Sequence, residues 1–167
     1  FENSFTRLAT LLRTLAERSA RAPASIVVLS GDVHHAYVSR VHDPTSTAEW
    51  YSAVYQLVSS PLRHPMPKGM QWIYRVMVSQ PFTRLTRRLA QRAGVEEPHI
   101  TWQVDEGPWF DNQIATLALD GRRATFRLER SFLDDGHPRL ETLLEKQLVG
   151  DRDWPALIAR TRESAAR

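Results

Sequence analysis

A chain of 167 residues, of which 42% are hydrophobic and 25% are charged, is long enough for one domain with a core and short for two. This composition excludes intrinsic disorder and collagen, and the lack of cysteine excludes disulfides and thiolate metal sites. The net charge of +3 is too small to indicate nucleic acid, and no apolar run approaches the ~20 residues that span a bilayer. We therefore expect no nucleic acid partner and no membrane span.

The first half of the chain predicts one helix and three strands. The helix is expected from Asn3 to Ala20, where apolar residues recur on one helical face at Phe5, Leu8, Leu12 and Leu15. An uninterrupted β-branched run, Ser25–Ser30, is typical of a central strand covered on both faces. Shorter strands are expected at Tyr37–Val41 and Val54–Ser59.

The second half changes from a helical period to an alternating one. A helical pattern from Met66 to Ala93 is expected in two pieces, because Pro81 fits the first turn of a helix but not its interior. The second piece is expected to bury the stripe formed by Phe82, Leu85, Leu89 and Ala93. Alternating residues from Ile100 to Leu128 predict strands, with a type I′ hairpin turn at Asp120-Gly121.

These elements predict an α/β fold. We expect a mixed sheet in which Ile26–Leu29 is central and the hairpin at Asp120-Gly121 lies toward an edge. Asp151 to Arg167 reads as a short helical tail. Because the chain enters a helical pattern directly from Phe1, without a methionine, we expect it to be part of a longer protein, and both a cytoplasmic and an exported location stay open.

One segment carries residues suited to chemistry. Ser30–His35, with the sequence SGDVHH, places a carboxylate and two imidazoles at the carboxyl end of the first predicted strand, where open α/β sheets usually form their sites. Oxygen and nitrogen donors of this kind suit a divalent or trivalent ion. A structural interpretation stays open, since an Asp after a Gly often caps a turn and a neighbouring His often makes a single hydrogen bond. The other histidines, at positions 42, 64, 99 and 137, are interpreted as solvated.

Three segments resemble one enzyme family. Ile26–Tyr37, IVVLSGDVHHAY, is similar to the last metal-binding motif of PhoD-like phosphatases, a branch of the calcineurin-like metallophosphatases. Tyr55–Arg63 resembles the segment that follows this motif in the family, and Trp109–Gln113 through Asp120-Gly121-Arg122 resembles its closing hairpin. The resemblance covers roughly residues 5 to 130.

The resemblance implies a two-layer β-sandwich flanked by helices, of which residues 1–150 would be the C-terminal half, ending in antiparallel hairpin strands. It also implies a binuclear metal centre, of Fe, Ca, Mn or Zn, that hydrolyses a phosphomonoester or phosphodiester. Asp32 and His34 match metal-site positions, and His35 is the candidate catalytic residue, as a phosphate contact or proton donor. The family's earlier motifs are absent before Ser30, so the expected partners are the missing N-terminal half of the same domain and a phosphate-ester substrate.

Arg63 is the candidate substrate-binding residue, because a guanidinium after the Ser-Ser-Pro break can neutralise a phosphate by a bidentate contact. An unpartnered surface arginine is the alternative. The sequence departs from the family pattern at His64, where the family has Asn. With only two or three ligands present, the chain alone is expected to bind metal weakly, to hydrolyse nothing measurable and to self-associate.

A non-catalytic role is the alternative function. Four cations lie on one face of the second helical piece and could contact a polyanion or a partner segment: Arg84, Arg87, Arg88 and Arg92. A solvated face is favoured over such a contact, because the neighbouring stripe of Phe82, Leu85 and Leu89 explains the helix as an ordinary core element.

Overall fold

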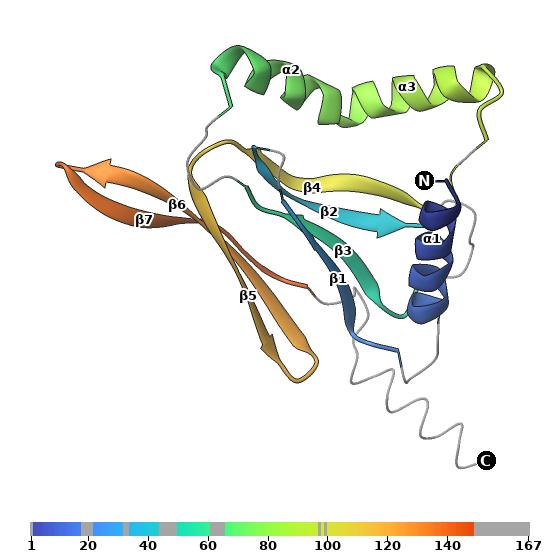
Figure 1. Ribbon diagram of the computed structural model, residues 1–167, viewed down its shortest axis with the longest axis horizontal. Coiled ribbons are helices and arrows are strands. Elements are labelled where there is room, and N and C mark those ends of the chain that lie inside the picture. Colours follow the sequence, from blue (N-terminus) through green and yellow to red (C-terminus); the bar gives the residue numbers. More distant parts are fainter. Residues whose placement is uncertain are drawn as a thin grey trace.

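The computed structural model describes residues 2–17, 22–31, 34–43, 50–60, 66–96, 98 and 100–148. Within these ranges the chain forms a mixed α/β fold with two sheets and three helices (Figure 1). The elements are α1 (Glu2–Glu17), β1 (Ser25–Ser30), β2 (Ala36–His42), β3 (Ala53–Val58), α2 (Lys68–Val78), α3 (Gln80–Arg92), β4 (Thr101–Trp109), β5 (Gln113–Asp120), β6 (Arg123–Asp134) and β7 (His137–Gln147). The predicted tail at 151–167 lies outside the described residues.

The two sheets differ in strand direction. The first has the order β1-β3-β2-β4, with β1 parallel to β3 and with β2 antiparallel to both β3 and β4. The second has the order β5-β6-β7 and is antiparallel throughout. The hairpin strands therefore form a sheet of their own, and β5 lies at its edge.

The prediction that Ile26–Leu29 is central is wrong for the part of the chain that the structure describes. β1 is the edge strand of the first sheet, and its Leu29 side chain is 65% exposed. Ile26 and Val27 are only partly buried, on opposite faces of the sheet. A β-branched run indicates a strand, but it does not say how many neighbours that strand has.

The main core lies between the two sheets. Alternate residues of β3, Ala53, Tyr55 and Leu57, share one buried cluster with alternate residues of β6, Ala124, Phe126 and Leu128. This alternation follows from the period of two in a strand, which places every second side chain on the same face. The two sheets thus pack through a shared apolar layer.

The opposite face of the first sheet is covered by α1. Ala9, Leu12 and Ala16 of α1 pack against Val41 and Val54 of the sheet. Among the predicted stripe residues, Leu12 is buried, whereas Phe5 and Leu8 are 38% and 45% exposed. The buried face of α1 is therefore centred on two alanines, which allow the helix to approach the sheet closely.

The helical region after β3 is divided as predicted, with Pro81 in the first turn of α3. The buried stripe predicted for this helix is wrong. Neither α2 nor α3 has a buried residue, and Phe82, Leu85 and Leu89 are 37%, 54% and 54% exposed. In the described part of the chain, no helix is long and apolar enough to cross a bilayer.

Two tight turns connect the strands of the second sheet. Asp120 pairs with Arg123, and of the two residues between them only Gly121 has a positive φ, of 58°, so the turn is not type I′ as predicted but has the type II′ pattern. The type I′ pattern occurs at the next turn, where Asp135 and Gly136 have φ values of 47° and 78°. The strand after this turn, β7, was not predicted.

Candidate metal and phosphate site

Strand directions bring parts of the three family-like segments to one edge of the first sheet. The Asp120-Gly121-Arg122 part of the third segment lies instead near the start of β1, where the Arg122 guanidinium donates a hydrogen bond of 2.6 Å to the Ala22 carbonyl. Since β2 is antiparallel to its neighbours β3 and β4, and β1 is parallel to β3, the ends of β1, β3 and β4 lie beside the beginning of β2. The chain leaves β1 at Gly31, leaves β3 at Ser59 and leaves β4 at Phe110. Figure 1 shows α2 beginning near this edge.

The first and second segments are in direct contact. The Ser59 backbone N–H donates a hydrogen bond of 3.2 Å to the Ser30 carbonyl, and the Gln56 side-chain amide donates one of 3.2 Å to the Ser30 hydroxyl. A Cβ atom at Gly31 would lie 3.2 Å from the Ser59 carbonyl oxygen. This close approach of two backbones explains why a glycine stands between the strand and its Asp-His segment.

His34 lies at the surface of this edge with an uncommon backbone conformation. Its φ is 57°, in the left-handed region that residues other than glycine adopt rarely, and its side chain is exposed. An exposed imidazole can supply a nitrogen ligand to a metal ion. Asp32, the other predicted ligand, lies outside the described residues, as do Arg63 and His64.

His35, the next residue, is enclosed. It is 2% exposed, and its ring lies 4.1 Å from the ring of Tyr74, 5.3 Å from that of Tyr37 and 6.0 Å from that of Phe110. These partners come from α2, β2 and the segment after β4, so His35 joins the motif to the helix pair and to the third family-like segment. Its role as a catalytic residue stays a prediction.

The aromatic cluster around His35 favours neutral groups. Burial raises the pKa of Tyr37 above its ordinary value, and burial together with the nearby Tyr37 raises the pKa of Tyr74. Both phenols therefore stay protonated at neutral pH. Sequence patterns did not identify Tyr74 as a site residue, because nothing in the pattern of α2 shows which residue of the sheet its inner face contacts.

The third segment ties this edge to the second sheet. Phe110 and Gln113 are 5% and 3% exposed, and the Gln113 side-chain amide donates a hydrogen bond of 3.1 Å to the Trp109 carbonyl. The Ser131 N–H of β6 donates one of 2.9 Å to the Asn112 carbonyl. The third segment therefore links the first sheet to the second.

The described residues do not by themselves form a metal site. Among them, no group of three or more His, Asp or Glu side chains lies close enough together to hold an ion. The exposed imidazole of His34 fits the nitrogen donor that the resemblance calls for. A complete site would need Asp32 and further ligands.

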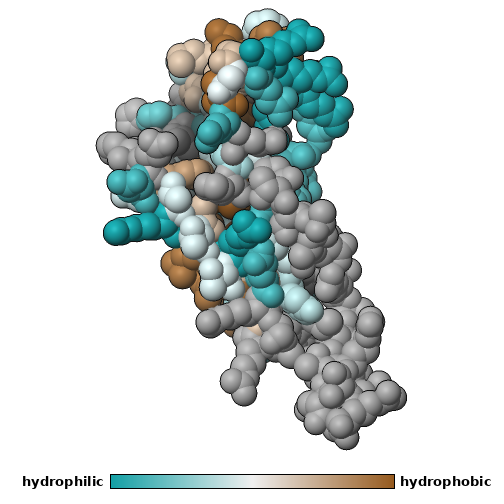
Figure 2. All heavy atoms as spheres, turned by 90° about the vertical axis from the view of Figure 1, so that its right-hand side faces the viewer, coloured by the Kyte–Doolittle hydropathy of each residue, from teal (hydrophilic) through white to brown (hydrophobic). Residues whose placement is uncertain are grey.

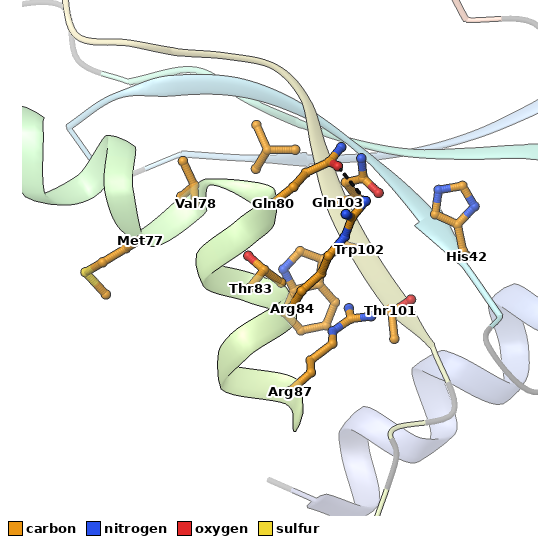
Figure 3. Close-up of a pocket in the computed structure, with 11 residues that line it drawn as sticks. His42, Met77, Val78, Gln80, Thr83, Arg84, Arg87, Thr101, Trp102 and Gln103 are labelled. Atoms are coloured by element: carbon orange, nitrogen blue, oxygen red, sulfur yellow. Dashed lines mark hydrogen bonds between the residues drawn. The ribbon is translucent and has the colours of Figure 1, made fainter. Parts of the chain in front are cut away.

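The four arginines of the alternative function lie elsewhere, on α3. Arg84 and Arg87 reach from α3 toward Trp102 of β4 and line a groove of about 300 Å³ (Figure 3). The Arg84 guanidinium donates a hydrogen bond of 3.1 Å to the Gln80 side-chain oxygen. Arg88 and Arg92 do not line this groove and are exposed.

Comparison with known proteins gave no match, whether with protein-family models, with curated proteins or with solved structures. The resemblance to PhoD-like phosphatases therefore stays a prediction from the three sequence segments.

Proposed function

We propose that the edge formed by the ends of β1, β3 and β4 belongs to the site of a metal-dependent phosphoric ester hydrolase, which acts on a phosphomonoester or phosphodiester. The observation that supports the proposal is that described parts of the three family-like segments, at Gly31, Ser59 and Phe110, meet at one edge of the sheet. Gly31 packs against Ser59 and Ser60, and His35 packs against Phe110. Segments that resemble one family at separate places in the sequence are expected to meet in space if they serve one site.

The proposed roles divide between holding metal and holding phosphate. Asp32 and His34 would bind a binuclear centre together with ligands from the N-terminal half that the resemblance requires. When bound, such a centre supplies a hydroxide at neutral pH and neutralises phosphate oxygens. The left-handed backbone of His34 supports this role, because uncommon conformations of this kind cluster at functional sites.

Two further residues complete the proposal. Arg63 would hold a phosphate oxygen pair through its planar guanidinium. His35 would contact the phosphate or donate a proton if its ring turned from the aromatic cluster toward the edge, and in its present position it holds Tyr74 and Phe110 in place.

The test uses the full-length protein that contains this chain. We expect hydrolysis of a chromogenic phosphomonoester or phosphodiester only with metal bound, lost on dialysis against a chelator and restored by Mn²⁺, Zn²⁺, Ca²⁺ or iron. Asp32→Ala and His34→Ala should each lower kcat/KM by at least ~100-fold, since even the loss of a residue that only orients a ligand costs 10–100-fold.

His137→Ala is the matched control, because His137 is exposed at the start of β7, in the other sheet. It should leave kcat/KM unchanged. Activity that survives the chelator, or wild-type rates in both the Asp32 and His34 variants, would contradict the proposal. The isolated 167-residue chain should bind Mn²⁺ weakly by calorimetry and show no turnover.

A further inference from the structure

The helix pair α2–α3 exposes more apolar surface than is expected of helices that face only water. It carries eight large apolar side chains that are 37–69% exposed: Met70, Trp72, Ile73, Val76, Met77, Phe82, Leu85 and Leu89. The solvated-face interpretation of the basic helix assumed that its apolar stripe was buried in the core. Because that stripe is exposed, the assumption fails.

Four of these side chains, Trp72, Val76, Leu85 and Leu89, point away from the rest of the molecule, whereas Met77 lines the groove between the helix pair and β4. The inner face of α2 is fixed by Tyr74, which contacts His35, and by Val78, which lines the groove with β4. The inner face of α3 is fixed by Thr83, which lines the same groove. At 100° per residue, Trp72 and Val76 lie opposite Tyr74 and Val78, and Leu85 and Leu89 lie opposite Thr83.

The charge of the helix pair has one sign. Its only charged residues are six cations, Lys68, Arg75, Arg84, Arg87, Arg88 and Arg92. Since the whole chain has 22 Lys and Arg against 19 Asp and Glu, the remainder has 16 against 19. The positive charge of this protein is therefore concentrated where its apolar side chains are exposed. Figure 2, which views the molecule from the α3 side, shows hydrophobic and hydrophilic side chains adjoining at this end.

Charge decides which partner fits this surface. A second copy would bring the same exposed cations, Lys68, Arg88 and Arg92, against those of the first and be repelled. The longest segment outside the described residues, 149–167, has four arginines against three acidic residues and brings no compensating charge. Nucleic acid supplies negative charge, but it has no apolar phase for exposed aliphatic side chains. A bilayer with anionic headgroups supplies both, side by side.

We infer that α2 and α3 lie in the plane of an anionic lipid bilayer, with the apolar stripe that contains Trp72, Val76, Leu85 and Leu89 inserted at the interface. Lys68, Arg88 and Arg92 lie beside this stripe, where Lys and Arg can reach headgroup phosphates while their stems cover apolar surface. Arg84 and Arg87 line the groove on the inner side of α3, and Arg75 stacks on Phe110. Trp72, 69% exposed, has the amphipathic ring that is enriched at membrane interfaces. The surface is independent of hydrolysis at the sheet edge.

The experiment measures sedimentation of the full chain with vesicles. Vesicles of phosphatidylcholine with a third of phosphatidylglycerol should bind the chain, and vesicles of phosphatidylcholine alone should not. Binding should weaken as the salt concentration rises from about 0.1 M to about 0.5 M. The fluorescence of Trp72, isolated as the difference between the wild type and Trp72→Phe, should shift to the blue on binding.

Two variants separate charge from insertion. Arg88→Glu/Arg92→Glu should lower partitioning into the vesicles by roughly 30-fold or more, because each cation near the surface contributes about fivefold to the partition coefficient. Leu85→Ser/Leu89→Ser should also lower it, without unfolding the chain, because α3 has no buried residue. The matched controls are Arg7→Glu, an exposed cation on α1, and Leu119→Ser/Leu133→Ser, which are 72% and 73% exposed on the second sheet. Neither should change partitioning.

Several outcomes would overturn the inference. They are equal binding to neutral vesicles, no binding at low salt, and a Trp72 emission that does not shift. Binding to a DNA duplex that depends on Arg88 and Arg92 but not on Leu85 and Leu89, with no vesicle binding, would assign the surface to nucleic acid. A dimer in solution that Leu85→Ser/Leu89→Ser dissociates would assign it to a second copy.

Discussion

The region built from the two sheets and α1 differs from the helix pair α2–α3 in what its apolar side chains contact. Leu128 and Leu148 are completely buried between the sheets, whereas Leu85 and Leu89 of α3 are each 54% exposed. Both regions carry apolar residues at regular spacing. The comparison teaches that spacing identifies an amphipathic element but leaves open whether its apolar face meets the protein's own core or another surface.

The largest expected effect is the loss of a side chain from the core between the sheets. Leu128→Ala should lower the free energy of unfolding by about 2–5 kcal/mol, because it removes apolar contacts and leaves a cavity. Leu85→Ala, the same change on α3, should change it by less than ~0.5 kcal/mol. Urea denaturation of both variants measures the difference. Equal losses would mean that α3 packs on the core after all.

Glycine substitutions sharpen the comparison with a smaller effect. Gly107 has a φ of 95°, and a Cβ there would lie 2.9 Å from the Trp109 ring and 3.0 Å from the Ala36 carbonyl oxygen. Gly107→Ala should therefore destabilise the protein by about 1–3 kcal/mol in the same denaturation experiment. A variant as stable as the wild type would show that β2 and β4 can separate at this point without cost.

The matched change in the helix pair, Gly69→Ala, is expected to stabilise the protein. A Cβ at Gly69 of α2 would meet nothing within 4 Å, so Gly69→Ala adds no contact and restricts only the unfolded chain. It should raise the free energy of unfolding by up to about 1 kcal/mol and therefore raise the thermal midpoint. Calorimetry checks the sign, and a lowered midpoint would contradict the exposed position of α2.

The smallest expected effect is a pH dependence at the contact between the two regions. The raised pKa values of Tyr37 and Tyr74 mean that the folded state holds both protons more tightly than the unfolded state. Stability is therefore unaffected below the ordinary value of 10.0 and falls as the pH rises through the raised values. Tyr74→Phe should reduce the fall in melting temperature between about pH 9 and pH 11. An unchanged fall would place the titrating group elsewhere.

The sequence predicted the bounds of the strands better than it predicted which strands pair with one another. The spans of β1, β2 and β3 agree with their patterns to within a residue or two, because alternation and β-branching are local signals. The edge position of β1 was missed, since strand order depends on pairing between distant residues. β7 was missed because Pro138 and a run of helix-favouring residues, Leu140 to Gln147, hide a strand that pairing with β6 imposes.

Residue types in the sequence identified candidate site residues, but they did not predict how those side chains are placed. The sequence pointed to His34 and His35 together, but they have opposite environments, one exposed and one 2% exposed. His34 and His35 precede β2, and the left-handed backbone of His34 turns the chain between the two side chains, which a motif does not express. The contacts of His35 with Tyr74 and Phe110 join segments far apart in the chain, and no local pattern predicts them.

β3 lies between the two strands that precede it in the chain, β1 and β2. During synthesis both earlier strands therefore leave the ribosome without a partner in this sheet, and neither can pair until residues 53–58 have followed. Such non-local pairing is slow, because the entropy of closing the loop is lost before the contacts form. Pairing within the first sheet can therefore begin only once β3 has been made, and until then the edges of β1 and β2 stay open to other partners.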